Sequence, residues 1–460
     1  MGKGRITSRQ QHLVLIVCIL ASFVAFLDGS VVNVALPAMV QELGGGLAIQ
    51  QWIVDAYLIT LGALMLVAGS FSDLFGRKRV LVWGLIGFAV TSVLCAVAPS
   101  GVFLVIMRAL QGLAGALLVP SSLALIISTF SGAAQGKAIG SWTAWTGIAF
   151  VVGPLLGGFL VDAYSWRLIF AINVLPIAVT LWLMRYLRSI EKPGKSPNID
   201  YMGAILCAVG LGGPVYALIE HARYGWSSPW IYLPLVGGLL VFGYFLLYEK
   251  KAKEPMLPLE LFTIRNFGIG NLATAAIYAG LSVATFLITV FIQQVGGYSA
   301  IEAGLALLPI TIIMFFLSSR FGALAGTFGP RLFMTLGPLI CGLSCLLMLL
   351  VDSRIQYWTH LFPGVVLFGL GLSITVAPLT SAILGSIAKE RAGIGSAINN
   401  AVARIAGLIA IAALGLVTGP VLDLEGFHRG LLAMAMLLGL GGLISGLGIQ
   451  NLHHRKPENA

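Results

Sequence analysis

The sequence predicts an all-α membrane protein built from two six-helix bundles and an inserted two-helix hairpin. Three observations lead to this fold class: the composition, a series of apolar runs long enough to cross a bilayer, and an internal repeat. Of the 460 residues, 58% are hydrophobic and only 10% are charged, and the mean hydropathy is +0.97. Soluble domains carry about 25% charged residues because their surfaces face water, so most of this surface is expected to face lipid.

Fourteen apolar segments are long enough to span the hydrocarbon layer, which takes about 20 helical residues. They cover residues 13–36, 52–71, 80–98, 102–124, 138–160, 167–187, 201–219, 229–248, 267–292, 303–326, 332–350, 357–385, 395–418 and 430–450. The first has the basic start of a signal peptide, but its apolar run is too long for one. No convincing cleavage site follows, so we expect this span to remain in the mature protein.

The basic residues indicate which side of the membrane each loop occupies. With the N-terminus inside, the inner segments hold 21 of the 27 Lys and Arg residues, the outer side holds four, and Arg108 and Arg404 lie deeper within spans. Cytoplasmic loops are enriched in Lys and Arg, so both termini are predicted to be cytoplasmic. The loops are short and carry no Asn-x-Ser/Thr acceptor, which favours a multi-pass protein of a bacterial inner membrane.

Two basic linkers, which begin at Arg188 and Glu249, flank spans seven and eight and set this hairpin apart. We therefore divide the chain into an N-terminal six-helix bundle (1–190), a linker with the inserted hairpin (191–260) and a C-terminal six-helix bundle (261–460).

An internal repeat supports two parallel halves, an architecture of transporters. The segment GSFSDLFGRKR after span two is echoed by GALAGTFGPR after span ten, at a constant offset of 253 residues. The matched pairs are Gly69 and Gly322, Gly76 and Gly329, and Lys78 and Arg331, whereas Gly326 stands where the first half has Asp73.

Four charged residues within the spans are candidates for function: Asp28, Asp55, Arg108 and Arg404. A charge in the membrane costs about 2.5 to 3.5 kcal/mol on the insertion scale, which makes each of them a functional hypothesis. Asp28 and Arg108 lie at compatible depths and are predicted to form an ion pair. If the partner moves, the carboxylate can load and release a proton, whereas a fixed pair would only orient helices. Asp55, near the outer end of its span, has the same two alternatives.

Polar residues recur at steps of three or four along the span over 267–292, and so share one helical face. They are Asn271, Thr274, Tyr278, Ser282, Thr285, Thr289 and Gln293. A polar face gains nothing from lipid, so it is expected to line a water-filled path or, alternatively, another helix. Asn400 and Arg404 extend this candidate substrate cavity, and the aromatic rings of Trp52, Trp142, Trp145 and Tyr278 offer faces to a cation.

Span five contains GPLLGG, in which Gly153 and Gly157 form a small-xxx-small face and Pro154 invites a bend. This suits a transporter that rocks, although ordinary tight packing explains it nearly as well. No P-loop, HExxH or GxSxG motif occurs, and the cysteines and histidines form no metal-binding pattern. We therefore expect no enzyme, metal or cofactor.

These motifs resemble those of the major facilitator superfamily, and specifically its fourteen-helix branch of drug:proton antiporters, across nearly the whole chain. LDGSVVNVALP from Leu27, GSFSDLFGRKR from Gly69, RALQGLAGA from Arg108 and GPLLGG from Gly153 are similar to four family motifs in the same order. EPMLPLELF from Glu254 is also typical of the branch. WIVDAY from Trp52 resembles quaternary-ammonium efflux pumps, whose second-helix Asp is associated with cationic substrates.

The resemblance implies roles for individual residues. Asp73 with Arg77 and Lys78 would form an inner-side latch in the motif that begins at Gly69 and contains Gly76, and Arg108 would take part in proton transfer. Gly153, Pro154, Gly157 and Gly158 would mark antiport rather than import. The second half departs from the pattern of the dication pumps, because its only acidic candidate near the membrane is Glu302.

The sequence therefore predicts a proton-coupled efflux antiporter for amphipathic compounds, especially cations, with Asp28 and Asp55 as proton carriers. It would need no cofactor, because the proton gradient drives it. Its partners would be a small amphipathic substrate, protons and the bilayer. It would bind no nucleic acid and would act as a monomer. A dedicated exporter of an endogenous antibiotic, amino acid or lipid is the alternative, and a membrane-embedded enzyme or a non-transporting sensor is least favoured.

Overall fold

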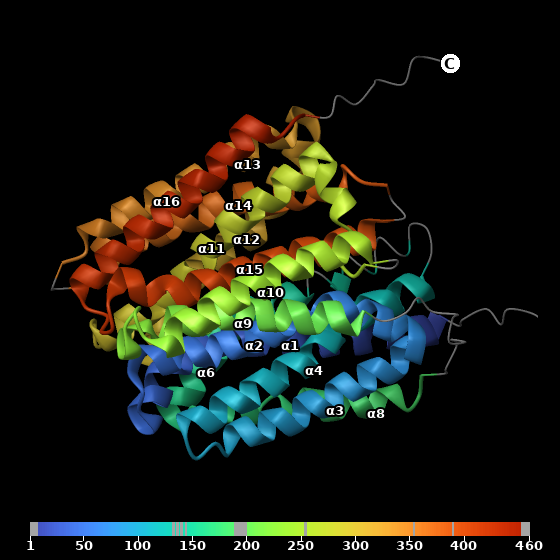
Figure 1. Cartoon of the computed structure of the whole chain (residues 1–460), viewed down its shortest axis with the longest axis horizontal. Helices are drawn as coiled ribbons and strands as arrows, with labels where there is room; N and C mark the ends of the chain where they lie inside the picture. Colours follow the sequence, from blue (N-terminus) through green and yellow to red (C-terminus); the bar gives the residue numbers. More distant parts are fainter. Residues whose placement is uncertain are drawn as a thin grey trace, which may run out of the picture. The chain divides into compact units, whose positions relative to one another are not determined.

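All regular secondary structure in the part of the chain that the structure describes is helical (Figure 1). The structure is a computed structural model; it describes residues 8–130, 134, 138, 141, 142, 145–187, 200–252, 255–352, 355–388 and 391–451, and at residues 66, 67, 69, 70, 73, 150, 151, 392 and 393 the backbone alone. Among these residues, thirteen helices are long and apolar enough to cross a membrane.

The first of two compact units comprises residues 1–257 and 297–305. Its helices are α1 (Ser8–Leu43), α2 (Gly46–Phe75), α3 (Arg77–Ala96), α4 (Gly101–Thr129), α6 (Ala149–Ala163), α7 (Leu168–Ala171), α8 (Val174–Met184), α9 (Tyr201–Tyr224) and α10 (Pro229–Lys251). α4 packs against α1, α2 and α3, and α6 packs along α1. α9 and α10 form the predicted hairpin, which rests on α2 through α9.

The second unit comprises residues 258–296 and 306–460. Its elements are the 3₁₀-helices η1 (Leu259–Thr263) and η2 (Met348–Leu350), the π-helix η3 (Tyr357–Leu361), and the α-helices α11 (Arg265–Gln294), α13 (Pro330–Leu347), α14 (Phe362–Leu384), α15 (Ala392–Thr418) and α16 (Leu424–Gly448). α11 packs along α15 and α16, and α13 packs along α14 and α16. α12 (Ala300–Phe328) begins in the first unit and continues in the second.

The predicted fold class is confirmed, and each predicted span overlaps a helical segment of the described residues. The span over 167–187 corresponds to α7 and α8, a shorter apolar segment over Leu168–Met184. α1 extends beyond the predicted 13–36 at both ends, because hydropathy marks only the apolar part of a helix and polar residues continue it. The number of fourteen crossings and the cytoplasmic position of both termini stay predictions.

The internal repeat is visible in the backbone of both units. Gly76 and Gly329 precede α3 and α13 with φ angles of +90° and +84°. A side chain is strained in such left-handed backbone, so glycine ends the preceding helix at both places. In each half, the fifth span also approaches the first span through a glycine: α6 approaches α1, and α15 approaches α11. A β-carbon on Gly153 would lie 2.0 Å from the Ser30 Oγ, and one on Gly407 would lie 2.3 Å from the Ser282 Oγ.

Candidate functional site

A buried ion pair joins α1 to α4 in the first unit. The Arg108 Nη1 donates a hydrogen bond to the Asp28 Oδ2 at 2.6 Å, and the two side chains are 2% and 0% exposed. The structure thus places these two sequence-predicted residues together. Because water does not solvate either charge, the pair depends on protein groups to satisfy its remaining donors and acceptors.

Polar side chains from three further positions complete the surroundings of the Asp28 carboxylate. The Asn173 Nδ2 and the Gln111 Nε2 donate to the Asp28 Oδ1 at 3.0 and 3.2 Å. Gln111 also accepts from the Arg108 Nη1 at 2.7 Å and donates to the Ser92 Oγ at 2.9 Å. These five side chains form a network between α1, α3, α4 and the start of α8, which we call the Asp28 network.

Arg108 also reaches α2 and α7. Its Nε donates to the Ile53 carbonyl at 3.1 Å, and its guanidinium lies 4.3 Å from the centre of the Tyr57 ring and 5.7 Å from that of Phe170. Such stacking over an aromatic face stabilises a cation. The close approach of α2 depends on Gly112, one turn beyond Arg108, because a β-carbon there would lie 2.3 Å from the Tyr57 carbonyl oxygen.

Asn173 is a member of the network that sequence reasoning missed. It lies between α7 and α8 in the apolar stretch RLIFAINVLPIAV and is fully buried. A lone amide in such a stretch was the available signal, since burial of an amide without a hydrogen bond is costly.

Asp55 has surroundings of a different kind. Its side chain is fully buried, and neither carboxyl oxygen has a hydrogen-bond partner among the described residues. The Gln50 amide, in the turn before it, is buried in the same way. A carboxylate without partners is costly in its charged form, and the neutral acid avoids that cost.

The tryptophans proposed to contact a cation each have separate surroundings. The Trp52 Nε1 donates to the Glu220 Oε1 of α9 at 2.9 Å, and the Trp142 Nε1 donates to the Ser22 Oγ of α1 at 3.0 Å. Trp145 is 56% exposed. No ring contact between the three is found among the described residues, so the structure does not assemble them into an aromatic cage.

The polar stripe on α11 divides into two parts. The Asn399 Nδ2 of α15 donates to the Asn271 Oδ1 at 3.2 Å and to the Thr274 Oγ1 at 2.9 Å. Asn271 and Thr274 are buried by this contact, so the alternative of a helix contact holds for them. Further along, the partly exposed positions are Tyr278, Ser282 and Thr285. On α15, Asn400 is exposed and donates to the Ser396 carbonyl, while Arg404 is partly exposed.

The Gly-Pro motif lies within α6 and brings two other helices close. A β-carbon on Gly157 would lie 2.4 Å from the Val31 Cγ2 of α1, and one on Gly158 would lie 2.4 Å from the Ile301 Cα of α12. Conversely, a β-carbon on Gly304 would lie 2.6 Å from the Pro154 carbonyl oxygen. The glycines therefore permit backbone contacts that larger residues would prevent.

One turn beyond the motif, Asp162 caps the first turn of α12. Its two oxygens accept from the amides of Ala300 at 3.0 Å and Ile301 at 2.7 Å. Glu302 takes part in the same helix start, because its Oε2 accepts from the Ser299 amide at 2.8 Å while the Ser299 Oγ accepts from the Glu302 amide. Glu302 thus forms a capping box, which gives the only acidic candidate of the second half a structural role.

The latch segment is described in part. The Gly69 and Asp73 side-chain positions lie outside the described residues, and Arg77 begins α3 directly after Gly76. The Lys78 Nζ donates to the Leu187 carbonyl just beyond α8. Lys78 therefore ties the start of α3 to the end of the last helix of its half.

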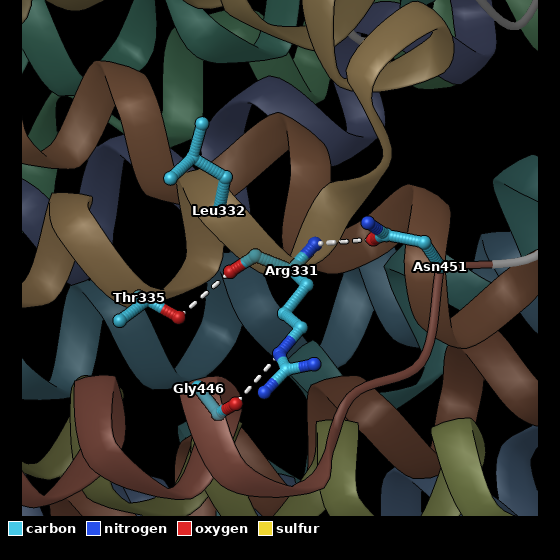
Figure 2. A pocket seen from close by; sticks show the side chains of 5 residues that line it. All are labelled: Arg331, Leu332, Thr335, Gly446 and Asn451. Atoms are coloured by element: carbon cyan, nitrogen blue, oxygen red, sulfur yellow. Dashed lines mark hydrogen bonds between the residues drawn. The ribbon is translucent and has the colours of Figure 1, made fainter.

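The repeat counterpart of Lys78 makes an equivalent contact in the second unit. The Arg331 Nε donates to the Gly446 carbonyl of α16 at 2.7 Å, and Asn451 accepts from the Arg331 amide at 3.1 Å (Figure 2). These residues line a pocket of about 310 Å³ with Leu332 and Thr335. The lining contains no carboxylate, and we assign it a structural role.

Long apolar helices, a repeat shared by two units and a buried ion pair define a multi-pass membrane protein of the transporter class. The chain belongs to the major facilitator superfamily, whose family model matches residues 18–411. This confirms the resemblance drawn from the four motifs.

Curated relatives are resistance and export proteins of this superfamily. The methylenomycin A resistance protein of Bacillus subtilis is 34% identical over 418 residues, which cover 89% of this chain and 88% of the relative. The puromycin resistance protein pur8 of Streptomyces alboniger is 33% identical, with 88% and 81% covered. The multidrug resistance protein Stp of Mycobacterium tuberculosis is 32% identical, with 89% and 76% covered.

Solved structures of low sequence identity share the fold. A peptide transporter in complex with sulfate has a TM-score of 0.71 at 15% identity and covers 97% of both chains. A bacterial homologue of the human lysosomal transporter Spinster, in an inward-facing conformation, has a TM-score of 0.68 at 16% identity, with 96% and 97% covered.

Proposed function

We propose that the chain is a proton-coupled antiporter that exports amphipathic compounds, cations among them, across a bacterial inner membrane by alternating access. The observation that carries the proposal is the Asp28 network, a buried ion pair in which a titratable carboxylate is held by donors from several elements. The names of the relatives support export of toxic compounds. The Gly-Pro motif supports antiport, because it resembles the motif that marks antiporters of this superfamily. The proton gradient is the proposed energy source, with no cofactor and no chemical reaction of the substrate.

The chemistry of coupling follows from the charge of Asp28. In the ionised state, the carboxylate holds Arg108, Gln111 and Asn173, and through them α3, α4 and the start of α8. A proton on Asp28 cancels the attraction to Arg108 and removes one acceptor, so the contact between α1 and α4 weakens. Because binding of a proton favours one arrangement of these helices over another, proton uptake and release shift the populations of the two access states.

The proton gradient supplies enough free energy for useful export. Each proton that moves down about 100 mV gives about 2.3 kcal/mol, which sustains roughly a fifty-fold concentration ratio of an uncharged compound exported for one proton. For a cation, the exchange must move more positive charge as protons than as substrate, or draw on the pH difference.

Proton release from energised inside-out vesicles on addition of ethidium tests the proposal. The native chain is compared with Asp28→Asn and with Glu42→Gln, an acid of the same helix whose half-exposed side chain pairs with Arg167 at 2.6 Å. We expect ethidium-induced proton release from the native chain and from Glu42→Gln, and none from Asp28→Asn. Unchanged release from correctly inserted Asp28→Asn would contradict coupling at this carboxylate.

A dedicated exporter of one compound is the second candidate, because two relatives are named for resistance to a single antibiotic. A panel of lipophilic cations separates the two functions. Proton release with several unrelated cations supports broad efflux, whereas release with none of them favours the dedicated exporter.

A further inference from the structure

Arg404 differs from Arg108, the other arginine that lies deep within a span. It lies near the middle of the α15 span, Ile394–Thr418, and is partly exposed. No ion pair or hydrogen bond of its side chain is found in the part of the chain that the structure describes. Arg108, in contrast, has an acid, an amide, a carbonyl and two rings around it.

Among the described residues, the helices that pack most extensively on α15 supply no counter-charge for Arg404. These helices are α11, α14 and α16. α11 and α14 contain no Asp or Glu, and the acid of α16, Glu425, lies in its first turn beside Arg429. An unpaired arginine in a membrane span costs about 2.5 to 3.5 kcal/mol on the insertion scale, and such residues mark substrate or ion pathways.

The residues around Arg404 form a surface with both aromatic and polar character. Tyr278 lies on α11 where that helix packs along α15, since a β-carbon on Gly407 would lie 3.9 Å from the Tyr278 carbonyl oxygen. One turn before Arg404, Asn400 is exposed on α15. One turn after it, Gly407 lets α15 pack closely against Ser282 of α11. The site therefore offers one positive charge on α15 and an aromatic residue on the helix that packs along it.

We propose that Arg404 binds the oxyanion group of an exported compound, so that amphipathic organic acids belong to the substrate range. The inference rests on the proposed export function and adds a chemical class to it. A guanidinium donates through a planar fork that fits a carboxylate with two parallel hydrogen bonds, and these bonds are strong where water is scarce. The Tyr278 ring would pack on the apolar part of the acid.

Binding of a matched pair of fluorescent probes tests this site. Dansyl-leucine carries a carboxylate, and its methyl ester has the same apolar body without the charge. Their affinities are measured by dansyl fluorescence on the purified full chain, for the native protein, Arg404→Gln, Arg404→Lys and a control, Arg320→Gln, which removes an exposed arginine near the end of α12.

We expect the native chain and Arg320→Gln to bind the acid at least about ten-fold more tightly than the ester, a difference of about 1.4 kcal/mol. Arg404→Gln should abolish this preference and strengthen ethidium binding, because the loss of a positive charge favours a cation. Arg404→Lys should keep part of the preference, since the charge remains without the planar fork.

Two results would overturn the inference: equal affinities of the native chain for acid and ester, or a similar loss of acid, ester and ethidium binding in Arg404→Gln. The second result would assign Arg404 to the stability of the unit or to a counter-charge for a carboxylate. Failure of the proposed function is seen separately, because a chain that prefers the acid but releases no protons with any compound would contradict coupling and leave the site at Arg404 intact.

Discussion

Asp28 and Asp55 are both buried acids of the first unit, but their hydrogen bonding differs. Arg108, Gln111 and Asn173 donate hydrogen bonds to the Asp28 carboxylate. Asp55 has no such donor among the described residues, so its two oxygens are buried without a hydrogen-bond partner there. A network of donors therefore distinguishes Asp28 from Asp55.

Replacement of Asn173 tests whether the network tunes Asp28. Asn173→Ala removes a hydrogen bond to a charged acceptor, an interaction worth about 1.5 to 3 kcal/mol. We expect ethidium-induced proton release in vesicles to fall by roughly ten-fold or more at equal protein levels. Thr180→Val is the matched control, because Thr180 is an equally buried polar residue of α8 whose hydroxyl only donates to the Pro176 carbonyl in its own helix. Equal losses in both variants would show that α8 packing, and not the Asp28 network, causes the effect.

The sequence was sufficient to predict the ion pair but not its surroundings. Asp28 and Arg108 were found because each charge within an apolar run is costly and their depths agree. Asn173 and Ser92 are neutral, and depth alone does not show which neutral residues meet a charge. Asn271 and Thr274 share the polar face with Tyr278, yet a pattern on one helix does not reveal that Asn399 of α15 covers part of that face.

At the scale of helices, glycines decide which pairs approach closely. Gly112 lets α4 contact α2, and the β-carbon that it lacks would lie 2.1 Å from the Thr60 Oγ1. The same hydroxyl donates to the Ala109 carbonyl of α4 at 2.7 Å, so the contact is both tight and hydrogen-bonded. The apolar runs predicted each of these helices, but they did not predict the partner of Gly112, because glycine is frequent throughout the chain at 57 residues.

Gly112→Ala should destabilise the first unit, whereas Gly237→Ala should not. The added methyl at Gly112 has no space, and overpacking typically costs about 1 to 3 kcal/mol. At Gly237 of α10, a β-carbon meets nothing within 4 Å, and alanine favours a helix over glycine by up to about 1 kcal/mol. Thermal unfolding of the purified chain followed by size-exclusion chromatography should give a lower midpoint for Gly112→Ala only. A midpoint for Gly112→Ala at or above that of the native chain would contradict the packing assigned to α2 and α4.

At the scale of the whole molecule, the repeat extends beyond the loop motif that revealed it. Gly76 and Gly329 share backbone geometry, and Lys78 and Arg331 both donate to carbonyls at the ends of later helices. The sequence predicted this correspondence because glycine and a basic residue are needed at the same places. It did not predict that α12 begins in the first unit. Asp162 accepts hydrogen bonds from Ala300 and Ile301, which lie 138 and 139 positions further along the chain, and no local pattern predicts so distant a contact.

Asp162→Ala should loosen the start of α12. The first amides of a helix have no partner within the helix, and a carboxylate at this end also interacts favourably with the helix dipole. Without Asp162, the amides of Ala300 and Ile301 lose their acceptors, so we expect hydrogen–deuterium exchange in a peptide covering residues 299–305 to rise by roughly ten-fold. Glu425→Gln, which changes an acid at the start of α16, should leave this peptide unchanged. If exchange at 299–305 stays slow in Asp162→Ala, the packing of Gly158 and Gly304 alone holds α12, and the carboxylate is not needed for that contact.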